Sequence, residues 1–252
     1  MSVFTEVVLI LATGIVAGII NVMAAGGSLL TLPVLIFLGL PSSVANGTNR
    51  IAIVVMSMTA TTNFYRKGYF DKKLGPVLAI PGIIGAIVGA NLAITISDKL
   101  FNTVLAIMMV ITVIFILWNP SKRLSQKKKD KENSKWRLII AILVFFFIGI
   151  YGGFIQAGAG FFMITALTAI FGLSLVRSNA IKTFVSGVYV LVSLLIFIYH
   201  GEVNWLLGVT LAVGMSIGGW IGSSLAVSKG EKLIRVFLVV AVVGMAIKLL
   251  FF

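Results

Sequence analysis

The stretch Ala24-Ala25-Gly26-Gly27-Ser28 recurs in the second half of the chain as Gly158-Ala159-Gly160-Phe161, with Gly27 and Gly160 separated by 133 positions. The same offset joins Asn46-Gly47-Thr48-Asn49-Arg50 to Asn179-Ala180-Ile181-Lys182-Thr183. A constant offset of this kind indicates an internal duplication. Glycine-rich interruptions at corresponding places in two apolar halves are typical of secondary transporters, whose substrate site lies where the broken helices meet.

The composition places this duplicated chain in a membrane. Of its 252 residues 60% are hydrophobic and 11% are charged, and both halves contain apolar runs of the roughly 20 helical residues that cross a bilayer. Many of the Lys and Arg residues behind the formal net charge of +13 lie in the polar stretch 119–136. Membrane orientation and anionic lipid headgroups account for such a cluster, so no nucleic-acid partner is expected.

We predict an all-α integral membrane protein with a first membrane repeat at 1–118, a basic cytoplasmic linker at 119–136 and a second membrane repeat at 137–252. Each repeat has about five helical segments, roughly 5–24, 27–40, 44–65, 73–97 and 99–118, then 137–157, 160–173, 177–199, 204–226 and 231–251. The second segment of each five is too short to cross fully at about 1.5 Å per residue. It is therefore a short broken or half-helix.

Positive charge predicts the orientation of the repeats. The basic loop at 66–73 and the linker belong on the cytoplasmic side, whereas the equivalent loop of the second repeat, 199–204, has no Lys or Arg and is expected outside. Equivalent loops on opposite sides give two inverted-topology repeats with both termini outside. The inverted arrangement requires that each short segment, together with the chain beside it, crosses the membrane. If the short segments are re-entrant instead, the two halves are parallel.

The glycine breaks also predict a substrate site. A half-helix that begins at either break points its N–H groups and the positive end of its dipole toward the middle of the protein, which suits an anion. Two cations and several amides without a carboxylate suit a small oxyanion. The candidate substrate-binding residues are Asn21, Gly26, Gly27, Ser28, Asn46, Asn49, Arg50, Gln156, Gly158, Gly160, Asn179 and Lys182. Alternatively, the two cations snorkel to lipid headgroups and the amides are interhelical hydrogen-bond partners.

Other classes of function lack the residues they need. All seven acidic residues fall at predicted helix ends or in loops, which argues against an intramembrane proton relay. The sequence has no cysteine, and its single histidine, His200, falls in a loop, so a Ser–His hydrolase and a metal site are disfavoured. We expect no enzyme activity, no cofactor and no metal. An anion channel or a non-transporting membrane scaffold is the alternative, although the nearly apolar runs at 51–56 and 190–198 argue against a continuous polar pore.

The sequence resembles the TauE/SafE family, also called the toluene sulfonate uptake permease family of sulfite and organosulfonate transporters. The resemblance rests on 25–33, 39–50, 158–162 and 179–183 and spans essentially the whole chain, with Ala25 in place of a glycine that is frequent in the family. It implies a multi-pass transporter of the inner (plasma) membrane, commonly an exporter of sulfite, sulfoacetate or related sulfur-containing anions, with two inverted halves. We therefore expect alternating access around a central site, with a small anionic substrate and membrane lipid as partners. The glycine faces of the fourth segments would also permit a homodimer.

Overall fold

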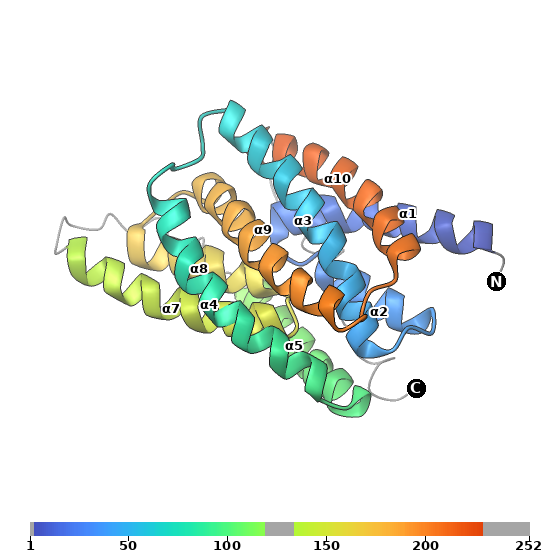
Figure 1. The fold of residues 1–252 in the computed structure, drawn as a ribbon. Helices are drawn as coiled ribbons and strands as arrows, with labels where there is room; N and C mark the ends of the chain where they lie inside the picture. Colours follow the sequence, from blue (N-terminus) through green and yellow to red (C-terminus); the bar gives the residue numbers. More distant parts are fainter. Residues whose placement is uncertain (1–2, 119–133, 229–252) are drawn as a thin grey trace.

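The computed structural model describes residues 3–118 and 134–228, and over these ranges its regular structure is entirely helical. The predicted all-α class is therefore confirmed. The helices are α1 (Val3–Ala24), α2 (Ser28–Phe37), α3 (Ser42–Arg66), α4 (Leu74–Thr95), α5 (Asp98–Trp118), α7 (Ser134–Phe154), α8 (Ala159–Phe171), α9 (Leu175–Tyr199) and α10 (Trp205–Ser228) (Figure 1). The predicted segment 231–251 and the linker residues 119–133 lie outside the described residues.

Within the described ranges, five helices are long and apolar enough to cross a membrane, namely those at Thr5–Ala24, Leu74–Thr95, Lys135–Phe154, Leu175–Tyr199 and Trp205–Val227. Helices α2 and α8 are short, with 10 and 13 residues. Large apolar side chains face outward, as at Ile80 and Phe147, which are 61% and 64% exposed. Such a surface suits lipid rather than water, and the chain is a multi-pass membrane protein.

Helices α3 and α9, which occupy equivalent places in the two halves, pack against each other at the centre (Figure 1). Each step forward along α3 is matched by an equal step back along α9, so the two helices are antiparallel. The contacts that define this register are Gly47–Phe197, Arg50–Ser193, Ser57–Gly187 and Thr61–Thr183. Small residues at these crossings allow the two backbones to approach closely.

The first helix of each half packs on the fourth helix of the other half. Helix α1 runs parallel to α10, with Gly14 against Gly214 and Ile15 against Gly218. Helix α4 runs parallel to α7, with Gly82 against Gly149 and Ala86 against Gly153. A Cβ atom at Gly218 would meet the backbone of α1, so the glycine faces of the fourth segments are covered within the chain. A homodimer would have to use other surfaces.

Two helix boundaries differ from the prediction for backbone reasons. Helix α7 ends at Phe154 rather than 157, because Gln156 and Gly158 adopt φ values of 70° and 79°. Helix α2 ends at Phe37 rather than 40, because Gly39 has a φ of 92°. Left-handed backbone cannot continue a right-handed helix. Helix α7 also begins at Ser134, inside the predicted linker.

Candidate functional site

Both glycine breaks use left-handed backbone at equivalent positions. In the first break, between α1 and α2, Ala25 has a φ of 55°; in the second, between α7 and α8, Gly158 has a φ of 79°. These residues are 133 positions apart. Glycine adopts this conformation at little cost, whereas alanine loses about 1 kcal/mol or more. In the second break, the hydroxyl of Tyr151 donates to the carbonyl of Ala157, which fixes the shape of the turn.

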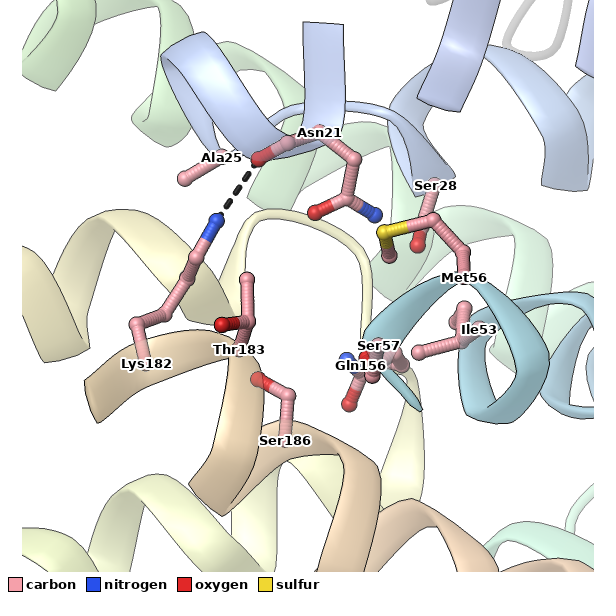
Figure 2. Close-up of a pocket in the computed structure, with 11 residues that line it drawn as sticks. Asn21, Ala25, Ser28, Ile53, Met56, Ser57, Gln156, Lys182, Thr183 and Ser186 are labelled. Atoms are coloured by element: carbon pink, nitrogen blue, oxygen red, sulfur yellow. Dashed lines mark hydrogen bonds between the residues drawn. The ribbon is translucent and has the colours of Figure 1, made fainter. Parts of the chain in front are cut away.

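The two breaks adjoin a small cavity, here called the polar cavity, which has a volume of about 10 Å³. That is room for about one water molecule. Both halves contribute to its wall through the breaks and through α3, α8 and α9. The lining residues are Asn21, Ala25, Ser28, Ile53, Met56, Ser57, Gln156, Gly160, Lys182, Thr183 and Ser186 (Figure 2). None of these lining residues carries a carboxylate.

Lys182 supplies the positive charge of the polar cavity. Its side chain extends from α9, is only 1% exposed, and donates from Nζ to the backbone carbonyl of Asn21 at 2.7 Å (Figure 2). This carbonyl belongs to the C-terminal end of α1, where the helix dipole is negative. The ammonium is thus buried at the break and does not snorkel to a headgroup.

Arg50 is fully buried but does not line the polar cavity. Its Nη1 donates to Ser193 Oγ at 2.7 Å and to the carbonyl of Gly152 at 3.3 Å. Its Nη2 donates to the carbonyl of Gly153 at 2.5 Å and to Asn46 Oδ1 at 3.3 Å. The guanidinium also lies 4.6 Å from the centre of the Phe197 ring. Arg50 therefore joins α3 to the C-terminal end of α7 and to α9.

The two cations have reciprocal positions. Arg50, from the first half, binds the last turn of α7, and Lys182, from the second half, binds the last turn of α1. Each cation thus lies at the negative end of the broken helix of the opposite half. Only Lys182 also faces the polar cavity. The sequence placed both cations near the breaks, but it did not indicate this exchange between halves.

Five of the residues predicted from sequence meet in the polar cavity: Asn21, Ser28, Gln156, Gly160 and Lys182. The others do not line it. Asn46 Nδ2 donates to the carbonyl of Phe154, and Asn49 Oδ1 accepts from Thr31. Buried Asn179 belongs to α9. Gly26 lies in the first break, Gly27 packs on Ala17 and Asn21, and Gly158 lies beside Thr112.

The sequence reasoning missed three hydroxyl residues of the cavity, Ser57, Thr183 and Ser186. Helical spacing could have found Ser186, since it lies four residues after Lys182 and so shares its face. Ser57 gives no such signal, because it reaches the cavity only through the crossing of α3 with α9. Its Oγ is buried and has no hydrogen-bond partner. The amide of Gln156 is held by Tyr189, whose hydroxyl donates to Oε1 at 2.7 Å.

A multi-pass membrane protein with a buried polar cavity between two broken helices has the architecture of a membrane transporter. The particular family follows from comparison with known proteins. A model of the family described as Sulfite exporter TauE/SafE matches residues 10–249. The chain belongs to this family.

Curated relatives carry transporter names. The chain is 30% identical over 238 residues to the probable membrane transporter protein YfcA of Escherichia coli strain K12, covering 93% of this chain and 86% of that protein. It is 27% identical over 246 residues to a probable membrane transporter protein of Haemophilus influenzae, covering 96% and 94% of the two chains. No solved structure matches. The family and these names indicate a membrane transporter and not an enzyme.

Proposed function

We propose that this transporter exports small sulfur-containing anions, such as sulfite, sulfoacetate or similar organic or inorganic species, across the inner (plasma) membrane. The observation that carries the proposal is the polar cavity. It combines a buried ammonium, two amides and four hydroxyls, and its lining has no carboxylate to repel an anion. Hydrogen bonds from charged and neutral donors of this kind suit an oxyanion.

The helix starts beside the cavity support the same chemistry. Neither Gly27 nor Gly158, the N-cap residues of α2 and α8, provides a side-chain cap to the helix that follows. Some N–H groups at these starts bond backbone carbonyls, as Leu29 does with Gly26 and Ala159 with Gln156, so it is chiefly the positive end of each helix dipole that favours an anion. Ser57 adds a second, independent indication, because its buried hydroxyl has no protein partner and lines the cavity.

The mechanism that we propose is alternating access around the polar cavity. At about 10 Å³ the cavity is smaller than any of these anions, so transport requires it to widen and close again. The antiparallel packing of α3 on α9 supports two inverted repeats, since equivalent helices of parallel repeats would run in the same direction. Movement of one repeat against the other would then expose the site to either side.

The direction of transport follows from the charge of the cargo and from the sign of the membrane potential. The orientation that we propose has the 119–136 linker in the cytoplasm and both termini outside. An inside-negative membrane potential favours export of an anion by about 2.3 kcal/mol per charge per 100 mV. Export can then proceed without an intramembrane carboxylate. The basic linker and the loop at 66–73 would meet anionic lipid headgroups on the cytoplasmic side.

The test is binding and counterflow with purified protein. Sulfite, sulfoacetate, sulfate, taurine and acetate are compared by thermal shift, because a ligand that binds only the folded state raises its stability. The Lys182→Gln variant should lose the shift given by sulfur oxyanions. Arg177→Gln is the matched control, since it removes the same charge from an exposed position of α9 outside the cavity.

Proteoliposome counterflow separates the carrier from its alternatives. A carrier gives saturable uptake that is stimulated by the same anion on the opposite side. A non-saturating conductance would identify a channel, and the absence of both binding and flux would favour a scaffold. An equal loss of the thermal shift in both variants would contradict the proposed site.

A further inference from the structure

Gln156 holds a backbone conformation that is unfavourable for its side chain. It lies in the second break with a φ of 70°, and in the described part of the chain only Ala25 shares a positive φ without being a glycine. Residues with a Cβ atom are disfavoured in this region, and those that occupy it cluster at functional sites. Glycine would form the turn at lower cost, which indicates that the side chain at position 156 has a use of its own.

The two ends of the Gln156 amide have different surroundings. Oε1 accepts a hydrogen bond of 2.7 Å from the hydroxyl of Tyr189. Nε2 donates to no protein group within the described ranges, although the side chain is buried and lines the polar cavity (Figure 2). The amide nitrogen of a buried side chain rarely lacks a partner. The two N–H bonds at Nε2 are therefore available to a ligand of the cavity.

Tyr189 is placed to fix this orientation of the amide. Its side chain extends from α9, is buried, and reaches the second break beside Gly152, which has no side chain to block the hydroxyl. The hydroxyl proton needs an acceptor in this buried position, and Oε1 supplies one only while Nε2 points away from Tyr189. Tyr189 does not itself line the polar cavity, so any effect on a bound anion passes through Gln156.

We propose that Tyr189 is a positioning residue for anion binding, because it holds Oε1 of Gln156 so that Nε2 donates to an oxyanion in the polar cavity. The inference rests on the proposed function and adds to it a residue outside the cavity that sets the polarity of one wall. With the amide held in this way, Gln156 acts as a donor beside Lys182 and Ser57. A donor that is oriented before the anion arrives needs no ordering on binding.

A purely structural role is the competing explanation, because the same hydrogen bond joins α9 to the second break. The two roles differ in what the loss of the hydroxyl changes. Loss of a structural bond lowers the amount of folded carrier and therefore the maximal transport rate. Loss of an oriented donor weakens anion binding and therefore raises KM.

The experiment measures counterflow of radiolabelled sulfite and of radiolabelled sulfoacetate by the full-length protein in proteoliposomes, and determines KM and the maximal rate for each variant. Tyr189→Phe removes only the hydroxyl. Ser193→Ala is the matched control, because it removes a buried hydroxyl one turn further along α9 that bonds Arg50 rather than a residue of the cavity. Gln156→Ala, alone and combined with Tyr189→Phe, tests whether Tyr189 acts through Gln156.

We expect Tyr189→Phe to raise KM by about fivefold or more, because an anion held by Nε2 then leaves Oε1 without a donor, while Ser193→Ala keeps the wild-type KM. In the Gln156→Ala background, Tyr189→Phe should raise KM by less than about twofold. An unchanged KM in Tyr189→Phe, an equal rise in Ser193→Ala, or equal effects in both backgrounds would overturn the positioning role while leaving the proposed function intact. Failure of the wild type to give saturable counterflow of either anion would overturn both.

Discussion

Replacement of Arg50 by Gln tests whether this buried cation holds the two halves of the protein together. The guanidinium donates to Gly152, Gly153 and Ser193 in the second half and to Asn46 in its own helix. A hydrogen bond from a charged donor contributes about 1.5–3 kcal/mol. Part of the total over these four bonds offsets the desolvation of the charge. Removal of the guanidinium leaves neutral buried acceptors without a donor, which costs about 1–3 kcal/mol for each of them.

Gln is too short to serve the same acceptors, so Arg50→Gln should leave about two of them without a donor and lose about 3–5 kcal/mol of stability. At about 2–4 °C per kcal/mol for a chain of this size, the unfolding temperature should fall by roughly 6–20 °C. Intrinsic tryptophan fluorescence of the purified protein during heating measures this change. Arg50→Lys keeps the charge but not the planar fork and should fall in between.

Lys182→Gln is the variant to compare with Arg50→Gln, because we expect Lys182→Gln to lose anion binding. Arg50→Gln should reduce the yield and stability of folded protein, while the protein that remains folded binds anions with wild-type affinity. If Arg50→Gln instead unfolds at the wild-type temperature and has lost anion binding, then Arg50 is an anion ligand and the connection between the halves lies elsewhere.

Three further outcomes are expected. Lys182→Gln should weaken sulfoacetate binding, measured by calorimetry, at least tenfold while membrane insertion is unchanged. Unaltered binding would exclude the ammonium from the site. Ala25→Gly should gain about 0.5–1 kcal/mol of stability because Ala25 has a φ of 55°, whereas Gly158→Ala should lose more than that because its Cβ would lie 2.6 Å from Thr112 Oγ1. Thermal unfolding that shows the opposite order would contradict the backbone assignment of the breaks. Gly218→Ala should destabilise the protein more than Gly208→Ala, because the new methyl group meets the backbone of α1 in one case and the end of a flexible isoleucine in the other; equal unfolding temperatures would argue against close packing of α1 on α10.

The sequence predicted most of the fold because lipid imposes a simple rule on it. A span needs about 20 apolar residues, so segment lengths alone separated the long helices from short α2 and α8. The offset of 133 residues and the glycines at 26–27 and 158–160 located both breaks. Boundaries were missed where single residues such as Gln156 adopt left-handed backbone, which glycine content alone does not reveal.

The candidate site, like the fold, could be predicted from the sequence only in part. The sequence by itself predicted a site of amides, Ser28 and two cations at two helix breaks, because polar residues are costly in a membrane and concentrate where they are needed. It left open whether the cations are buried or reach lipid headgroups. Only the tertiary structure decided which cation faces the polar cavity. Arg50 and Lys182 lie at nearly equivalent positions, but Arg50 is held by α7 and Lys182 faces the cavity. Contacts between residues more than 100 positions apart depend on the crossing of α3 with α9, and helical periodicity carries no information about that crossing.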